Sequence, residues 1–160
     1  MFVGDLFEDE EQKMVNYILG RSANDKRVCE NMAEELGLPD KKRGPFVGLK
    51  NQGATCYLNS FFQIIYMIPE VRKLFLELDV DKLTSNKKTV LIGLKTLFMQ
   101  MQYLDSQDQT TDVMSKAFGW EKSEVLDQHD IQEAMRIVFD FLEQGLSGSV
   151  ALNEFHRLLK

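Results

Sequence analysis

The chain has 160 residues, which fits one domain or part of a larger one, and 44% of them are hydrophobic, enough to bury a core. Its formal net charge of −6 argues against nucleic acid and anionic membranes as main partners. The two cysteines lie far apart with no C-x-x-C spacing, so we expect no zinc site and no other cofactor. No signal peptide or long apolar run is evident, and we therefore expect a reducing cytoplasmic or nuclear setting.

The first 43 residues are expected to form an acidic extension that carries short helices and ends in a basic linker. Residues 1–12 contain five acidic side chains and no lysine or arginine. The run K-K-R-G-P over residues 41–45 is typical of an exposed linker. The sequence therefore predicts two units, residues 1–43 and residues 44–160.

Residues 48–63 read G-L-K-N-Q-G-A-T-C-Y-L-N-S-F-F-Q, a loop of small and amide residues that leads through a cysteine into a helix. Cys56 falls at or just before the helix N-terminus, where unpaired N–H groups and the positive dipole end favour the nucleophilic thiolate. Asn51 is near enough to donate a hydrogen bond to a developing oxyanion. A lone intracellular cysteine is more often a small buried hydrophobe, so this pattern alone leaves both interpretations open. The apolar stripe of the predicted helix consists of Leu58, Phe61, Phe62, Ile65 and Ile68.

The rest of the chain shows helical periodicity and no strand-like alternation between residues 50 and 160. A polar turn is expected at residues 105–109 and a flexible joint at residues 145–149. The fold class is therefore predicted to be mainly α. Further helices are expected to begin at Pro69, just before Val90, at Thr111 and Asp112, near Asp130 and before Leu152.

Residues 127–143 read D-Q-H-D-I-Q-E-A-M-R-I-V-F-D-F-L-E and predict a helix with one buried face. Gln128, His129 and Asp130 stand at its front. Asp130 is placed to cap the helix or to complement its dipole, and this structural role is sufficient by itself.

The stretch around Cys56 resembles the cysteine box of the ubiquitin-specific proteases, a family of papain-like cysteine deubiquitinases also called ubiquitin carboxyl-terminal hydrolases. The stretch at residues 127–133 resembles the second box of the same family, and the two stand in the expected order about 70 residues apart. A-T-C-Y departs from the C-G-[SA]-C-[WY] signature of papain itself, which favours the deubiquitinase branch.

The resemblance implies a role for each matching position. Cys56 would be the nucleophile and Asn51 the oxyanion-hole side chain. Asp130 and Gln132 would bind the extended, basic C-terminal tail of ubiquitin, and Gln128 would support the catalytic cleft. No metal is implied.

The resemblance also implies that the chain is the helical thumb-like part of a papain-like protease domain, with the β-rich palm and fingers absent. In this family the general base lies far downstream in the palm. The two histidines, His129 and His156, match no base position. We therefore expect the 160 residues alone to be inactive, as a fragment of a longer protease or a truncated product.

Three hypotheses follow for function. The first is a cysteine-type deubiquitinase that hydrolyses the bond at the C-terminal glycine of ubiquitin, with ubiquitin or ubiquitinated proteins as partners. The alternative is a non-catalytic helical module that binds ubiquitin or another partner, and the third is a helical domain with a coincidental motif. We expect a monomer in the full protein and self-association of the isolated thumb, whose cleft-facing apolar surface would be exposed.

Overall fold

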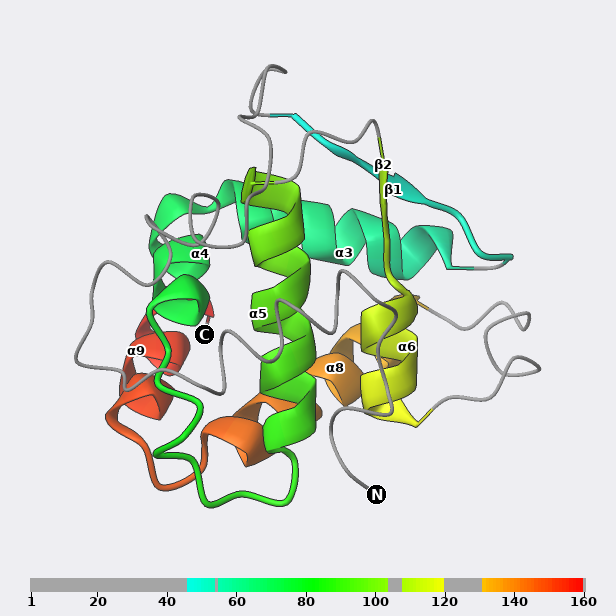
Figure 1. The fold of residues 1–160 in the computed structure, drawn as a ribbon. Coiled ribbons are helices and arrows are strands. Elements are labelled where there is room, and N and C mark those ends of the chain that lie inside the picture. Colours follow the sequence, from blue (N-terminus) through cyan, green and yellow to red (C-terminus); the bar gives the residue numbers. More distant parts are fainter. Residues whose placement is uncertain (1–45, 54, 104–107, 120–130, 160) are drawn as a thin grey trace.

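The computed structural model describes residues 46–53, 55–103, 108–119 and 131–159 (Figure 1). Most of these residues are helical, which confirms the prediction of a mainly α fold. The described elements, in chain order, are β1 (Gly48–Lys50), α3 (Cys56–Met67), α4 (Pro69–Leu76), α5 (Lys88–Tyr103), β2 (Asp108–Thr110), α6 (Asp112–Phe118), α8 (Ile131–Leu146) and α9 (Val150–Leu159).

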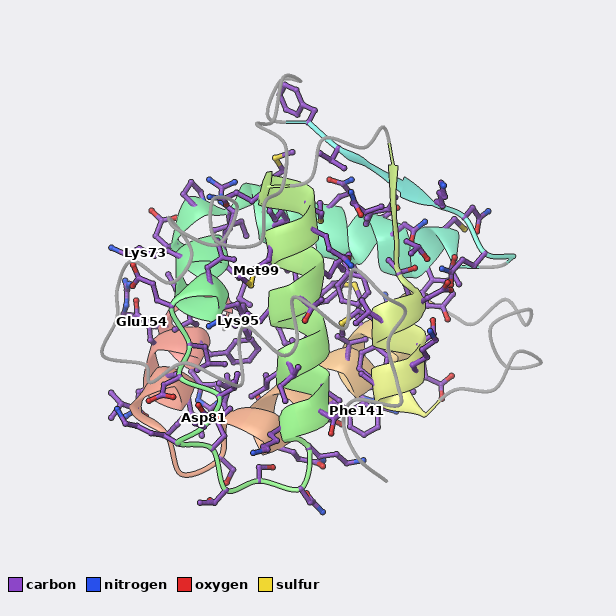
Figure 2. All side chains as sticks on the ribbon, in the orientation of Figure 1. Lys73, Asp81, Lys95, Met99, Phe141 and Glu154 are labelled. Atoms are coloured by element: carbon purple, nitrogen blue, oxygen red, sulfur yellow. The ribbon has the colours of Figure 1, made fainter. Side chains whose placement is uncertain are left out.

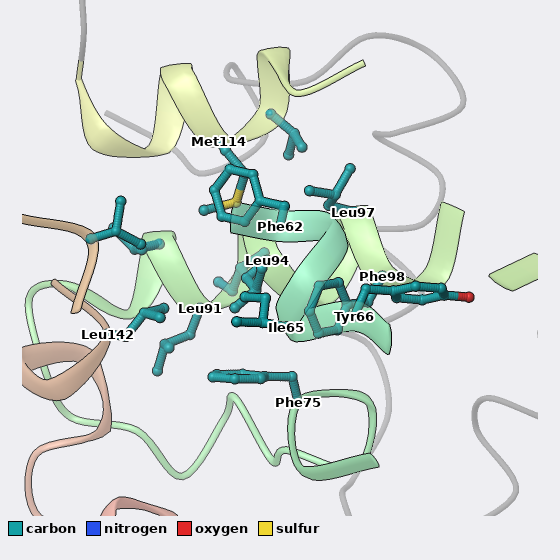
Figure 3. Close-up of a cluster of buried hydrophobic side chains, with 14 of the residues drawn as sticks. Phe62, Ile65, Tyr66, Phe75, Leu91, Leu94, Leu97, Phe98, Met114 and Leu142 are labelled. Atoms are coloured by element: carbon teal, nitrogen blue, oxygen red, sulfur yellow. The ribbon is translucent and has the colours of Figure 1, made fainter. Parts of the chain in front are cut away.

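Helix α5 lies in the centre of the described part, with α4, α6 and α8 packed around it and α3 in contact with it through the shared core (Figure 1). Every residue from Val90 to Met101 is buried. A helix that is buried on all sides must be apolar around most of its circumference, and α5 is. The close-up of the core shows Leu91, Leu94 and Phe98 of α5 among side chains from α3, α4, α6 and α8 (Figure 3).

A chain of aromatic ring contacts links five helices and returns to its starting helix. Edge-to-face and tilted ring pairs of this kind each contribute about 0.5–1.5 kcal/mol beyond the area that they bury. These ring contacts therefore help to fix the positions of the five helices relative to one another. Its contacts are Phe61–Phe139 at 5.6 Å, Phe139–Phe155 at 5.8 Å, Phe155–Phe75 at 6.1 Å, Phe75–Phe98 at 6.0 Å and Phe98–Tyr66 at 5.3 Å between ring centroids.

Among the described residues, one charged side chain, Lys95, lies in the mainly apolar core and is only 6% exposed (Figure 2). Its ammonium nitrogen donates a hydrogen bond of 2.8 Å to the carbonyl oxygen of Leu78, just beyond the end of α4. A buried ammonium group is tolerated only when its donors are satisfied, and this bond supplies one acceptor. Lys95 thereby ties the chain after α4 to the central helix.

Two helix starts predicted from punctuating residues, at Pro69 and at Thr111 and Asp112, are confirmed. Pro69 occupies the first turn of α4, after Ile68 in an extended conformation. Thr111 is the N-cap of α6, and Gly119 ends that helix in the left-handed conformation with φ 74°.

The prediction that residues 50–160 contain no strand is wrong. Residues 108 and 109, which were expected to end a polar turn, belong instead to β2 (Asp108–Thr110). This strand pairs in parallel with β1, so that Leu49 lies opposite Gln109. A three-residue polar strand shows no alternation, and its partner lies far away in the sequence, so no local pattern could have predicted it.

The predicted flexible joint at residues 145–149 is also partly wrong, because α8 continues to Leu146 and includes Gly145. A Cβ atom built on Gly145 would lie 2.8 Å from Cγ of Leu91 on α5. This glycine therefore serves close helix packing, and the turn begins only at Ser147.

Ile65 and Ile64 form a matched pair that tests which face of α3 is buried. Ile65 is 2% exposed in the core, whereas its neighbour Ile64 is 61% exposed. We expect Ile65→Ala to lower the free energy of unfolding by about 2–5 kcal/mol, because it leaves a cavity. Ile64→Ala should change it by less than about 0.5 kcal/mol. Urea denaturation followed by circular dichroism measures both, and equal losses would contradict this packing.

Candidate active site

Cys56 is the first residue of α3, and its side chain is exposed and not in a disulfide. The next two residues, Tyr57 and Leu58, are buried, so the helix is anchored directly behind the thiol. The first turn of α3 holds no acidic residue, and no carboxylate of the helix itself neutralises its positive dipole end. The prediction that the cysteine stands at a helix N-terminus is therefore confirmed, and the thiol is not a buried hydrophobe.

The loop between β1 and α3 brings Asn51 beside the residue that precedes the cysteine. Gly53 has φ 127°, in the region that favours glycine, and lets the chain fold back on itself. The Thr55 hydroxyl donates a hydrogen bond of 3.1 Å to Oδ1 of Asn51 and accepts one of 3.0 Å from the backbone N–H of Gln52. The Asn51 side chain is exposed and held at the start of α3.

Two amide side chains on one face of α3 hold β1 against the helix. Asn59 Nδ2 donates hydrogen bonds to the carbonyl oxygens of Leu49 at 3.2 Å and Lys50 at 3.0 Å. One helical turn later, Gln63 Nε2 donates to the carbonyl oxygen of Val47 at 2.6 Å. The strand that leads into the loop is therefore bonded to the helix that follows the loop.

Residues at the end of β2 complete this network from the other side. The buried Thr111 hydroxyl donates a hydrogen bond of 3.2 Å to Oδ1 of Asn59. Thr110 Oγ1 accepts one from the Gln52 side chain and another, of 3.1 Å, from the backbone N–H of Asp112. Sequence reasoning missed the roles of Thr55, Asn59, Thr110 and Thr111. The roles of the last three depend on the pairing of β1 with β2, which no local pattern predicted.

Tyr57 contributes a neutral phenol behind the thiol. Burial raises the pKa of Tyr57 above its ordinary value, and the adjacent Cys56, when charged, raises it further. Tyr57 therefore carries no charge at neutral pH.

The predicted tail-binding residues are only partly visible. Gln132 lies exposed in the first turn of α8, the helix whose Phe139 packs on Phe61 of α3. Gln128 and Asp130, together with His129, lie outside the described residues.

His156 lies on α9, where its Nε2 is 3.1 Å from Oε1 of Glu143 on α8. Helix α9 packs on α4, which follows the C-terminal end of α3, whereas Cys56 marks the other end (Figure 1).

Within the described part of the chain, no group of three or more His, Cys, Asp or Glu side chains is arranged to hold a metal ion. None of the helices described is both long enough and apolar enough to cross a membrane.

Comparison with known proteins identifies relatives of this chain. A family model described as ubiquitin carboxyl-terminal hydrolase matches residues 47–159. Ubiquitin C-terminal hydrolase 13 of Arabidopsis thaliana is 37% identical over 120 residues, which cover 75% of this chain and 11% of the relative. Ubiquitin carboxyl-terminal hydrolase 40 of Homo sapiens is 34% identical over 164 residues, which cover 97% of this chain and 13% of the relative. The chain thus spans about a tenth of the length of these curated relatives.

Asn59 offers a test of the network that holds the loop. Asn59→Ala removes three hydrogen bonds and leaves the buried Thr111 hydroxyl without this acceptor, so we expect the free energy of unfolding to fall by about 2–4 kcal/mol. The matched control is Asn153→Ala at an exposed position of α9, which should change it by less than about 0.5 kcal/mol. Urea denaturation compares the two variants. Similar values would mean that the amide of Asn59 does not hold the loop.

Proposed function

The chain belongs to the ubiquitin carboxyl-terminal hydrolase family, and on that premise we propose that it supplies the nucleophile-bearing part of a cysteine deubiquitinase. The observation that carries the proposal is the exposed thiol of Cys56 on the first residue of α3, a helix with one face buried in the core, with the carboxamide of Asn51 held close to it. Substrates would be ubiquitin conjugates, joined through the C-terminal glycine of ubiquitin.

The proposed reaction begins when the Cys56 thiolate attacks the carbonyl carbon of that glycine. The carbonyl oxygen becomes an oxyanion, and Asn51 donates a hydrogen bond to it. Collapse of the tetrahedral intermediate breaks the isopeptide bond, and the lysine amine leaves with a proton from a general acid. Water then hydrolyses the thioester on Cys56 and restores the thiol.

The general base is expected outside this chain. Among the described residues, His156 is the one histidine, and it is paired with Glu143. Since neither His129 nor His156 matches the base position that the family resemblance implies, we expect the 160 residues alone to turn over no substrate.

Ubiquitin recognition is assigned to the front of α8. Asp130 and Gln132 would pair with the arginines and the backbone of the ubiquitin tail, and Gln128 would support the cleft. The exposed position of Gln132 in the first turn of α8 leaves that surface accessible.

The exposed face of α3 supports the expectation about association. It carries Ile64 and Met67 together with Cys56 and Ser60. In the whole protease we propose that this face is covered and the protein is a monomer, whereas the isolated chain would self-associate through it. We also propose a cytoplasmic or nuclear location, on the cysteine usage of the sequence.

A second candidate function is a ubiquitin-binding module without catalysis. It is favoured by the position of His156, because α9 packs on α4, which follows the C-terminal end of α3, whereas Cys56 begins that helix. Such a module would bind ubiquitin in an NMR titration and would leave an electrophilic ubiquitin probe unreacted.

The nucleophile is tested with ubiquitin whose C-terminus carries an electrophile. We expect the full-length protein to be labelled, and Cys56→Ala to abolish labelling because the attacking sulfur is lost. Cys29→Ala is the matched control and should be labelled as the unmodified protein is. A mass shift on an SDS gel reads both, and labelling that survives in Cys56→Ala excludes this nucleophile.

The oxyanion role is tested by turnover of a ubiquitin–fluorophore amide. Asn51→Ala should lower kcat by about 10²–10³-fold with little change in KM, because the lost hydrogen bond forms only as charge develops. Activity equal to that of the unmodified protein would remove Asn51 from the mechanism.

A further inference from the structure

Thr55 is a buried threonine at the N-cap of α3 whose hydroxyl makes no hydrogen bond to the first turn of the helix. An N-cap threonine ordinarily accepts a hydrogen bond from the backbone N–H two or three residues later. Here the hydroxyl is turned back into the loop, where it contacts Gln52 and Asn51. The side chain therefore serves the loop and not the helix.

Counting protons fixes the orientation of the Asn51 carboxamide. The backbone N–H of Gln52 can only donate, so it uses a lone pair of the Thr55 oxygen. The single hydroxyl proton of Thr55 then needs an acceptor, which Oδ1 of Asn51 provides at 3.1 Å. If the carboxamide were flipped, Nδ2 would face the same oxygen and the buried hydroxyl proton would lose this acceptor.

The consequence is that Nδ2 of Asn51, which carries two N–H donors, is directed away from Thr55. Asn51 itself is exposed, and an exposed amide would otherwise rotate freely. The loop that carries both residues turns at Gly53, and it is held by the Gln52–Thr110 contact and by the attachment of β1 to α3 through Asn59.

We propose that Thr55 is a positioning residue that holds the donor end of Asn51 toward the oxyanion formed at Cys56. The inference rests on the proposed function and deepens it, because it assigns a role to a residue that does not touch the substrate. Preorganised donors are effective because they need no reorientation as the charge appears.

The test compares Thr55→Val with Thr55→Ser in the full-length protein. Valine keeps the volume and branching and removes the hydroxyl, whereas serine keeps the hydroxyl. With the ubiquitin–fluorophore amide, we expect Thr55→Val to lower kcat about 10–10²-fold at nearly unchanged KM, and Thr55→Ser to lower it less than about threefold. Rates are normalised to the fraction that the electrophilic ubiquitin probe labels, so misfolded molecules are not counted.

Thr96→Val is the matched control, since Thr96 is equally buried and its hydroxyl has no hydrogen-bond partner among the described residues. It should leave kcat unchanged. Alkylation of Cys56 by iodoacetamide, which forms no oxyanion, should also be unchanged in Thr55→Val. A general structural defect would slow it or alter KM.

A double-mutant cycle separates this inference from the proposed function. If Thr55 acts through Asn51, adding Thr55→Val to Asn51→Ala should cause no further loss of kcat. If the losses of kcat in the two single variants multiply in the double variant, or if Thr55→Val has a normal kcat, the inference about Thr55 is wrong and the proposed function still stands. Normal activity in Cys56→Ala would overturn the proposed function itself.

A measurement on the unmodified protein does not depend on any variant folding. The ¹⁵N order parameter of the Asn51 side-chain amide should be about 0.8, near that of rigid backbone. A value below about 0.6 would mean that the amide is mobile and would overturn the inference.

Discussion

The side-chain amide of Asn59 joins the three segments that meet at the candidate site. It bonds to the last two carbonyl groups of β1 and accepts a hydrogen bond from Thr111 at the start of α6. Because β1 enters the loop of residues 51–55 and α3 leaves it, one buried amide fixes both ends of that loop. The positions of Asn51 and Cys56 relative to each other depend on these hydrogen bonds of Asn59.

The hydrogen bonds of Asn59 couple the candidate site to the core. Thr111 lies 52 positions after Asn59 and reaches it only because α5 carries the chain back through the centre of the fold. The ring contacts of Phe98 with Phe75 and Tyr66 hold α5 against α4 and α3. Loss of core packing would therefore displace β2 and release the loop, so the geometry of the thiol is set by residues that never approach it.

The helices could be predicted from sequence because each carries its own signal. Pro69 begins α4, and four members of the predicted stripe, Leu58, Phe61, Phe62 and Ile65, are buried as their spacing indicated. The fifth, Ile68, is half-buried and lies beyond the last residue of α3. The strand β2 and the helical position of Gly145 could not, because both depend on a partner element: β1 for the strand, and Leu91 for the glycine. The site divides in the same way. Cys56 and Asn51 could be nominated from the residue types at one stretch, whereas the contribution of Asn59 depends on where Thr111 lies in space.

Thr55 shows why a local rule fails at this position. A threonine that gives up its capping bond forgoes about 1 kcal/mol of helix stability. Helix α3 can tolerate that loss because its buried face, with Phe62 and Ile65 almost fully enclosed, holds it in place. A capping oxygen would also occupy the N–H groups that make the start of α3 attractive to negative charge. The departure from the capping rule therefore leaves the first N–H groups of α3 without the Thr55 oxygen, while the freed hydroxyl donates its hydrogen bond to Asn51.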